Sequence, residues 1–265
     1  MRVGVLGATG RMGLATCKAV LDAPDLDLVA AVARATGVGR PLGDLVPGAP
    51  EGLVVGEDLS DLLAAEAEVV VDFSRPEATA AAVEGLLGEG VHLVSGTTGL
   101  APEVMDDLGN LAGKADHGNA VWAPNFALGA VLAMHFAAVA GRFYPAAEVI
   151  ELHHQGKADA PSGTALRTAR AIAAGRKPES PAPGRESVPG VRGGEVEGVR
   201  VHSVRLPGLV AHQEVIFGGQ GEVLTVRHDS LDRSSFMPGV LLAVQAVGAR
   251  PGLTVGLEPL LGLGS

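Results

Sequence analysis

A glycine-rich turn follows the first apolar run of the chain directly. Val3–Leu6 has the pattern of a short strand, and Gly7-Ala8-Thr9-Gly10-Arg11-Met12-Gly13 then opens a helical stretch near residues 11–23. Glycines permit a tight turn and close backbone approach, and the N–H groups at a helix start attract a pyrophosphate. The turn therefore predicts a dinucleotide site at Gly7, Ala8, Thr9, Gly10, Arg11 and Met12. The alternative is a tight strand-to-helix turn that binds nothing.

Short apolar runs alternate with Ala-rich helical stretches over the first 123 residues. Continuous apolar strands of this kind indicate a parallel sheet that is covered on both faces. Further strands are expected at 26–33, 69–72, 91–95 and 120–123, and helices near 76–88 and 102–113. A helix at 234–247 and a strand at 253–257 return to the same sheet. The pattern predicts an α/β fold with a Rossmann-like dinucleotide-binding domain, over residues 1–124 and 235–265.

Longer strands with polar alternation begin at Ala147, and they predict a second domain over residues 125–234. The expected strands are 148–154, 199–206, 210–217 and 222–228, with one helix near 164–174. Polar alternation indicates an antiparallel or mixed sheet, so we expect an α+β domain for substrate binding and oligomerisation. Residues 175–198 are rich in Pro and Gly, and we expect a long loop there with a functional or mobile role.

The charge balance excludes several classes of partner. The chain has 20 Lys+Arg against 30 Asp+Glu, a net charge of −10, and a negative surface repels nucleic acids and acidic lipids. No apolar run approaches the ~18 residues of a membrane span. Residues 1–5 open as a strand rather than a charged leader, so we expect a cytoplasmic protein without nucleic-acid or membrane partners. Cys17 is the single cysteine, and neither a disulfide nor a metal site is expected.

The residue after the second strand bears on the choice of cofactor. An acidic residue about 20 positions beyond the glycine turn accepts the ribose hydroxyls in many such domains. Here Ala33 and Arg34 occupy that place. Arg34, with Arg11 as a second candidate, can meet a 2′-phosphate through charge-assisted hydrogen bonds. We expect NADPH to be favoured over NADH, although Arg34 can also be read as a solvated charge at a strand end.

Residues 148–166 carry the densest polar chemistry of the chain. If His153 and His154 continue the strand, they point to opposite faces and do not share a metal ion, so one can transfer a proton while the other binds substrate. Lys157 follows on a loop, where an ammonium can hold a carboxylate or donate a proton. Ser162-Gly163-Thr164 then begins a helix whose N–H groups suit a small carboxylate. The alternative is ordinary N-capping beside histidines whose hydrogen bonds are satisfied.

On these motifs the sequence resembles the dihydrodipicolinate reductase family of the diaminopimelate route to lysine. The resemblance covers nearly the whole chain, and the segment from the paired histidines to Thr164 is its most specific part. The other matching segments are Gly7–Gly13, Asp72-Phe73-Ser74-Arg75-Pro76, Gly96-Thr97-Thr98-Gly99, Ala123-Pro124-Asn125-Phe126 and His202-Ser203-Val204-Arg205.

The resemblance implies a role for each matching residue. It makes His153 the catalytic histidine, Lys157 the proton-donating lysine, His154 a substrate ligand, and Gly163 and Thr164 the pair that binds a substrate carboxylate. It also implies hydride transfer from NADPH or NADH to a cyclic dicarboxylate, and a homotetramer. Many relatives are acidic at the position of Ala33, which argues against a strong preference for NADH. The segments implied at the nicotinamide end of the cofactor are Gly96, Thr97, Thr98, Ala123, Pro124, Asn125 and Phe126.

Two other functions remain open from the sequence. Another two-domain imine reductase, or an enzyme like aspartate dehydrogenase, shares the glycine turn but lacks the segment from His153 to Thr164. A non-catalytic dinucleotide sensor needs the cofactor site alone, and in such a protein His153, His154 and Lys157 have no task. Substrate-dependent oxidation of the cofactor distinguishes the sensor from an enzyme.

Overall fold

The chain forms two compact units. The computed structural model describes residues 1–34, 36–175 and 185–263. The first unit comprises Met1–Phe126 and Phe236–Ser265, and the second comprises Ala127–Ser235. The second unit is therefore an insertion in the first, and the chain returns to the first unit through α7 (Met237–Val247).

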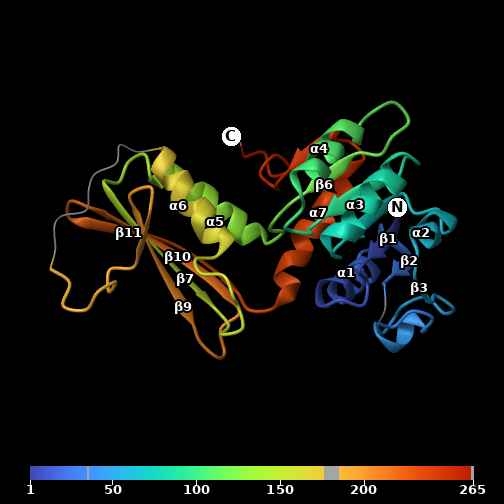
Figure 1. Ribbon diagram of the computed structural model, residues 1–265, viewed down its shortest axis with the longest axis horizontal. Helices are drawn as coiled ribbons and strands as arrows, with labels where there is room; N and C mark the ends of the chain where they lie inside the picture. The colour runs from blue at the N-terminus through green and yellow to red at the C-terminus, as the bar shows by residue number, and fades with distance from the viewer. Residues whose placement is uncertain (35, 176–184, 264–265) are drawn as a thin grey trace. The chain divides into compact units, whose positions relative to one another are not determined.

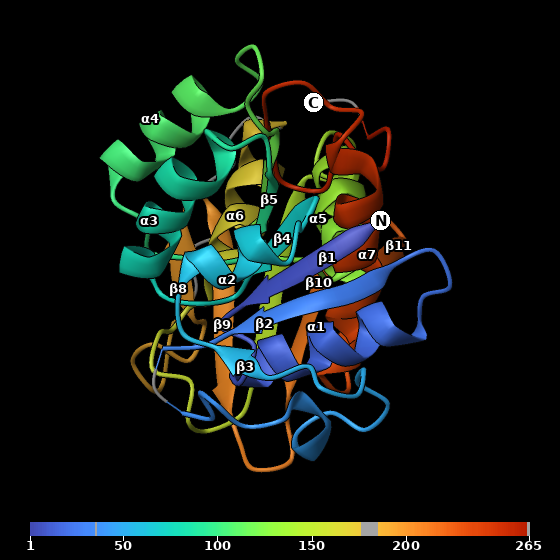
Figure 2. The ribbon, with the colours of Figure 1, turned by 90° about the vertical axis from the view of Figure 1, so that its right-hand side faces the viewer.

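The first unit is built on a parallel sheet. Within the described residues it has seven strands, in the order β12-β6-β5-β4-β1-β2-β3. The strand order reverses between β1 and β4, and ligands of such sheets bind outside the carboxyl ends of the strands at this point. Figure 2 shows β1, β2 and β3 side by side. The strands are β1 Arg2–Leu6, β2 Asp27–Val32, β3 Val55–Gly56, β4 Val69–Asp72, β5 His92–Ser95, β6 Ala120–Trp122 and β12 Leu253–Val255.

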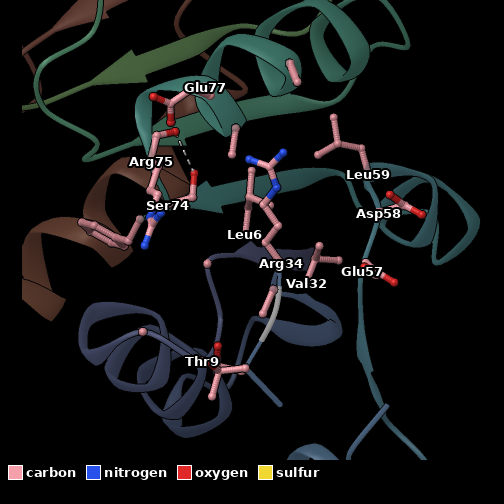
Figure 3. Close-up of a pocket in the computed structure, with 17 residues that line it drawn as sticks. Leu6, Thr9, Val32, Arg34, Glu57, Asp58, Leu59, Ser74, Arg75 and Glu77 are labelled. Atoms are coloured by element: carbon pink, nitrogen blue, oxygen red, sulfur yellow. Dashed lines mark hydrogen bonds between the residues drawn. The ribbon is translucent and has the colours of Figure 1, made fainter. Parts of the chain in front are cut away.

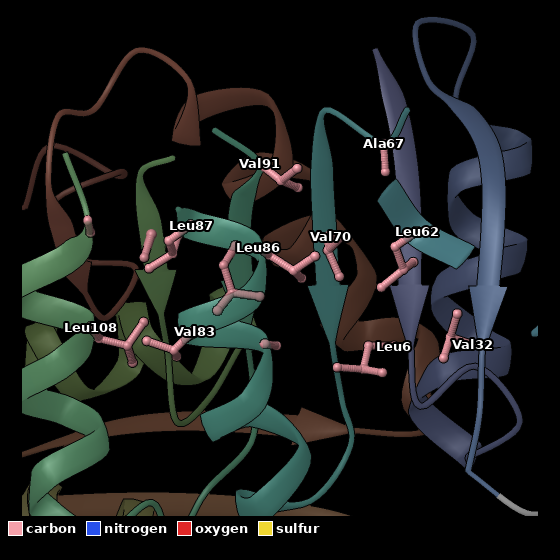
Figure 4. Packing of buried hydrophobic residues seen from close by; sticks show 14 of the residues in the cluster. Leu6, Val32, Leu62, Ala67, Val70, Val83, Leu86, Leu87, Val91 and Leu108 are labelled. Atoms are coloured by element: carbon pink, nitrogen blue, oxygen red, sulfur yellow. The ribbon is translucent and has the colours of Figure 1, made fainter. Parts of the chain in front are cut away.

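Helices cover both faces of this sheet. One face packs against α1 (Arg11–Asp22) and α7, which also contact each other. The other face packs against α2 (Leu59–Ala64), α3 (Pro76–Leu87) and α4 (Pro102–Leu111). Aromatic residues are only 3% of the chain, so this core consists mainly of aliphatic side chains. Figure 4 shows them: Leu6, Val32, Leu62, Ala67, Val70, Val83, Leu86, Leu87, Val91 and Leu108.

The second unit is a mixed sheet with helices on one face. Its described strands follow the order β11-β10-β7-β9-β8, in which β7 and β9 pair in parallel and the other neighbours are antiparallel. Figure 1 shows α5 (Leu128–Ala140) and α6 (Gly163–Ala174) side by side next to this sheet. They cover the buried side chains of Val149, Val201, Val215 and Phe217. The strands are β7 Ala146–His153, β8 Gly194–Val196, β9 Val199–Arg205, β10 Ala211–Gly219 and β11 Glu222–Ser230. The α/β and mixed-sheet architecture predicted from the sequence is confirmed.

Several local predictions need correction. The sequence pattern predicts one helix in the second unit, and the described part of this unit contains two α-helices. Helix α5 is apolar almost throughout, so no polar face marks its period. Strand β8 lies inside the expected loop 175–198, of which residues 176–184 are outside the described part of the chain. Strand β7 ends at His153, so His154 lies in the turn that follows.

Three further elements of the first unit do not appear in the sequence prediction. Strand β3, helix α2 and the short 3-10 helix Leu42–Asp44 lie between β2 and β4. They are only two to six residues long, which is too short for a hydrophobic period to develop. Within the described residues no helix has both the length and the apolar character needed to cross a membrane.

Candidate active site

A pocket of about 610 Å³ lies at the carboxyl ends of β1, β2 and β4. This volume is typical of sites for small molecules and cofactors. The pocket lies where the strand order of the sheet reverses, next to the glycine turn. Figure 3 shows its labelled lining residues, which come from four separate segments of the chain. These include Leu6, Gly7, Thr9 and Gly10 at the end of β1 and beyond it, Val32, Ala33 and Arg34 at the end of β2 and beyond it, Glu57, Asp58 and Leu59 at the start of α2, and Phe73, Ser74 and Arg75 after β4.

The glycine turn packs the start of α1 closely against the end of β1. Gly7 has φ +80°, a conformation that favours glycine, and its N–H donates to the carbonyl of Val32 at 2.9 Å. A Cβ on Gly13 would lie 2.1 Å from the carbonyl oxygen of Gly7, so no side chain fits there. Gly10 precedes α1 without a capping side chain. The turn thus fits a pyrophosphate at the helix start.

The predicted turn residues differ in their access to the pocket. Gly7, Thr9 and Gly10 line it. Ala8 is fully buried, whereas Arg11 is exposed, and neither of them belongs to the lining. Met12 is half-buried and also lies outside the lining.

Arg34 is exposed and belongs to the lining of the pocket, where Figure 3 labels it. Arg75, to which the sequence analysis gives no role, supplies a second cation to the same pocket. The acidic side chains Glu57, Asp58 and Glu77 line it as well. The pocket is therefore of mixed charge. An anionic group would bind most favourably next to the two arginines and away from these carboxylates, which repel it.

The buried carboxylate of Asp72 links the segments that follow β4 and β5 through hydrogen bonds. Asp72 ends β4 and is fully buried. One of its oxygens accepts a hydrogen bond from the backbone N–H of Ser74 at 2.9 Å. The other accepts from the hydroxyl groups of Thr79, Ser95 and Thr97 at 2.6, 2.8 and 3.1 Å. Asp72 therefore ties the end of β4 to α3 and to the turn after β5.

The family resemblance implies that residues 96–98 and 123–126 lie at the nicotinamide end of the cofactor. In the structure these segments lie at the carboxyl ends of β5 and β6. A Cβ on Gly96 would lie 2.2 Å from the ring of Phe73 and 3.1 Å from that of Phe126. These two rings pack edge to face with centroids 5.7 Å apart. The indole N–H of Trp122 donates to the carbonyl of Thr97 at 2.9 Å. Thr98 is exposed, Ala123 is buried, and Pro124 and Asn125 are half-buried. These segments lie outside the lining of the pocket described above.

In the second unit, polar side chains gather around Glu151 near the end of β7. Its side chain is 1% exposed, and both carboxylate oxygens accept hydrogen bonds from Arg205, at 2.9 and 2.8 Å. His153 Nδ1 is bonded to the same carboxylate, and the N–H of Ser162 donates to it at 3.3 Å. Burial alone would raise the pKa of Glu151, but hydrogen bonds from His153 and Arg205 lower it to about 2. Glu151 is therefore ionised near neutral pH.

Lys157 lies on the loop between β7 and α6. Its N–H donates to the carbonyl of His154 at 3.1 Å, and its ammonium donates to Asp159 at 2.7 Å. This ion pair lowers the pKa of the Asp159 carboxyl. The backbone carbonyl of Asp159 accepts a hydrogen bond from Arg205 at 2.6 Å. A Cβ on Gly156 would lie 3.3 Å from the ring of His154, so glycine leaves room for this imidazole.

The loop ends at the start of α6. The hydroxyl group of Ser162 accepts a hydrogen bond from the N–H of Ala165 at 3.1 Å, so Ser162 caps the helix. This bond confirms the capping interpretation for Ser162. The structure brings His153, Lys157 and this helix start together around Glu151 and Arg205.

Two central residues of this cluster have no role in the sequence analysis. Glu151 occupies an inward position of β7, two residues from the buried Val149. A carboxylate on the buried face of a strand is the signal that identifies such a residue, because burial of a charge requires partners. Arg205 lies inside a motif of the resemblance, but its sequence context does not show which group it contacts. Among the described residues, no group of three or more His, Cys, Asp or Glu side chains is arranged to hold a metal ion.

A parallel sheet with a pocket at the reversal of its strand order, followed in the chain by a mixed-sheet unit with a cluster of histidine, lysine and arginine side chains, is typical of two-domain NAD(P)-dependent oxidoreductases. The comparisons with known proteins then identify the family. The model for the N-terminus of dihydrodipicolinate reductase matches residues 1–126, and the model for its C-terminus matches residues 129–261. The chain belongs to the dihydrodipicolinate reductase family.

Individual relatives agree with this assignment. The chain is 50% identical to 4-hydroxy-tetrahydrodipicolinate reductase of Mycobacterium marinum, over 99% of this chain and 100% of the relative. It is similar to the structure of dipicolinate-bound dihydrodipicolinate reductase from Paenisporosarcina sp. TG-14, with TM-score 0.86, 37% identity and 98% of each chain covered. The amine dehydrogenase of Mycobacterium smegmatis shares the fold alone, with TM-score 0.66, 16% identity, and 96% of this chain and 94% of that chain covered. The family assignment favours the reductase over the alternative dehydrogenase and the sensor.

Proposed function

We propose that the chain catalyses the NAD(P)H-dependent reduction of 4-hydroxy-tetrahydrodipicolinate to tetrahydrodipicolinate in diaminopimelate and lysine biosynthesis. The observation that carries this proposal is the cluster of His153, Lys157 and the α6 start around the buried Glu151–Arg205 pair. The names of the curated relatives and the dipicolinate bound to the Paenisporosarcina protein support the substrate class.

The substrate is a dicarboxylate, so its site needs two groups that attract anions. Lys157 supplies an ammonium on the loop, and His154 is exposed beside it. The N–H groups of Gly163 and Thr164 lie at the positive end of α6 and suit the second carboxylate. Asp159, the present partner of Lys157, has a side chain that is 59% exposed. A substrate carboxylate can therefore replace Asp159, which then turns to water.

The 4-hydroxyl group of the substrate must leave as water, which gives a conjugated cyclic dicarboxylate. The chemistry that the dinucleotide would supply when bound is hydride donation to C4 of this dehydrated substrate. The chain must deliver a proton to the imine nitrogen or the adjacent carbon. Lys157 is the proposed proton donor, and its Nζ donates a hydrogen bond to Asp159. His153 is the second group proposed for proton transfer, with Nδ1 bound to Glu151. The Glu151 carboxylate keeps this ring in place during the proton transfer.

We also propose that NADPH is preferred over NADH. Ala33 is 4% exposed and has no carboxylate for the ribose hydroxyls. Arg34 and Arg75 line the same pocket and can bind a 2′-phosphate. The proposed cofactor contacts are Gly7, Ala8, Thr9, Gly10, Arg11, Met12 and Arg34 at the nucleotide end, and Gly96, Thr97, Thr98 and Ala123–Phe126 at the nicotinamide end.

The expected assembly is a cytoplasmic homotetramer formed through the second unit. Strand β11 is an edge strand that exposes apolar side chains, with Val223 69% and Leu224 37% exposed. Exposed apolar groups on an edge strand favour pairing with another chain. Light scattering of the purified protein measures the mass, and a monomer mass would contradict the tetramer.

The decisive experiment measures oxidation of NADPH and, separately, NADH by the purified protein. The substrate is made in situ by a synthase from pyruvate and aspartate semialdehyde, and omission of the synthase is the control. We expect oxidation that depends on the substrate, with a higher specificity constant for NADPH. Tight dinucleotide binding without oxidation of either cofactor would overturn the proposed function.

A further inference from the structure

Glu151 is an ionised side chain in a buried position, and that requires compensation. Its inward place on β7 would otherwise suit an aliphatic residue such as the neighbouring Val149, which is fully buried. Burial of an ionised carboxylate is strongly unfavourable unless charged partners surround it. Here Arg205 and His153 are those partners. The negative charge of Glu151 is therefore balanced by its neighbours, and its role lies in the residues that it contacts, Arg205 and His153.

Arg205 has no Nη proton left for a substrate. Nη1 donates to Glu151 and to the carbonyl of Val204 at 2.8 Å, and Nη2 donates to Glu151 and to the carbonyl of Asp159 at 2.6 Å. These four bonds use the four protons of the two groups. Nε is buried and has no hydrogen-bond partner within the described residues. Arg205 thus clamps β9 to β7 and to the loop of Lys157, and it does not bind substrate through its Nη groups.

The carboxylate also determines which nitrogen of His153 can react. An ionised carboxylate only accepts hydrogen bonds, so Nδ1 of His153 must carry a proton. The neutral ring then has its lone pair on Nε2, and the protonated ring releases its proton from Nε2. We propose that Glu151, fixed by Arg205, is a positioning residue that holds His153 in the tautomer with Nδ1 protonated and leaves Nε2 for proton transfer. This inference rests on the proposed function of His153.

The substitution Glu151→Gln tests the assignment. The glutamine oxygen can accept from Arg205, and its NH₂ group then donates to Nδ1 of His153. The neutral ring must carry its proton on Nε2, so that nitrogen no longer accepts one. We expect kcat to fall by about 10²–10⁴, the range for loss of a positioned acid or base, with the KM of the dinucleotide little changed.

Nitrogen NMR of histidine-labelled protein reads the tautomer without reference to activity. The chain has eight histidines, and the spectrum of His153→Gln assigns the signals. We expect the neutral ring of His153 to be protonated on Nδ1 in the unaltered protein and on Nε2 in Glu151→Gln. A ring protonated on Nε2 in the unaltered protein would overturn the inference, whatever the variants do. An unchanged kcat in Glu151→Gln would overturn it as well.

The chain offers a matched control on the same strand. Glu148 accepts hydrogen bonds from Arg192 at 2.6 Å and from His202 at 2.8 Å, so it also joins an arginine and a histidine. Glu148→Gln should leave kcat and the signals of His153 unchanged. Arg205→Lys keeps the charge of Glu151, so we expect the Nδ1 tautomer to persist. If the expected tautomer is seen but no substrate-dependent oxidation occurs, the proposed function fails and the tautomer assignment stands.

Discussion

Lys157 is one of four lysines in the chain, and its side chain is 24% exposed in a loop between β7 and α6. Lys157→Ala should lower kcat by about 10²–10⁴, because the reaction loses the side chain proposed as its proton donor. The KM for NADPH should change little, since the proposed cofactor contacts all lie in the first unit. Steady-state kinetics measures both values.

Lys18→Ala is the control for this substitution, since Lys18 also forms an ion pair with an aspartate, Asp22, on an exposed helix surface. It should leave the rate unchanged. A Lys157→Ala enzyme with the original rate would remove Lys157 from the mechanism.

Arg34 is the residue on which the proposed cofactor preference mainly rests. Arg34→Ala should lower the ratio of the specificity constants for NADPH and NADH about tenfold or more, the equivalent of one hydrogen bond to a charged group. Kinetics with each cofactor gives the ratio. Arg40→Ala removes another exposed arginine of the same region, which pairs with Asp44, and should leave the ratio unchanged. An unchanged ratio in Arg34→Ala would assign Arg34 to the solvated surface.

The residues that the sequence proposes as reactive differ from the buried carboxylates that the structure shows. His153 and Lys157 are proposed from the sequence because their chemistry and local motif are visible in the chain. Glu151 and Asp72 act through partners that are distant in sequence, such as Arg205 for the first and Ser95 for the second. Only the register of the strands brings these partners together, so the sequence pattern leaves them unassigned.

At the scale of single elements, two glycines in helices differ in whether the structure has room for a side chain at their position. Gly13 lies in α1 where a Cβ would meet the backbone of the glycine turn at 2.1 Å, whereas Gly109 lies in α4 with nothing within 4 Å. Gly13→Ala should destabilise the first unit and weaken NADPH binding, because α1 must move from the turn. Gly109→Ala should raise stability by about 0.5–1 kcal/mol, since alanine favours a helix.

Thermal unfolding and dinucleotide titration check this pair of variants. Equal effects of the two substitutions would contradict the close approach of α1 to the turn.

The elements that could be predicted are those with strong local contrast. Strands β1, β4 and β5 are apolar and bounded by polar or glycine-rich turns, so their limits follow from the pattern to within one residue. Helix α5 has little polar contrast, and β8 has three residues in a Pro- and Gly-rich region. These two elements depend on packing against α6 and pairing with β9, which are tertiary contacts.

At the scale of the whole molecule, stability should fall in acid. The pKa of Glu151 is lowered from its ordinary value of 4.5 to about 2. A carboxyl group whose pKa is lower in the folded than in the unfolded protein stabilises the fold at pH values above its unfolded-state pKa. This stabilisation is lost as the pH falls through the folded-state pKa. Glu151 therefore stabilises the folded protein by about 3 kcal/mol above pH 4.5, and this stabilisation is lost as the pH falls from about 4.5 to about 2. The carboxyl groups whose lowered pKa adds to the effect are Glu148, Asp159, Asp229 and Asp232.

Denaturant unfolding at several pH values measures this dependence. Glu151→Gln should unfold more easily at neutral pH but lose less stability between pH 4.5 and 2 than the unaltered protein. The same slope in both proteins would show that Glu151 does not carry the linkage.

The insertion of the second unit also determines the order in which the chain can fold as it is synthesised. All strands of the second unit leave the ribosome before α7 and β12, the last elements of the first unit. Until then β6 has an unpaired edge, and the sheet face over β4, β5 and β6 lacks the cover of α7. The unit at the start of the chain is therefore the last to be completed, and a nascent chain stalled before residue 237 exposes apolar surface that chaperones bind.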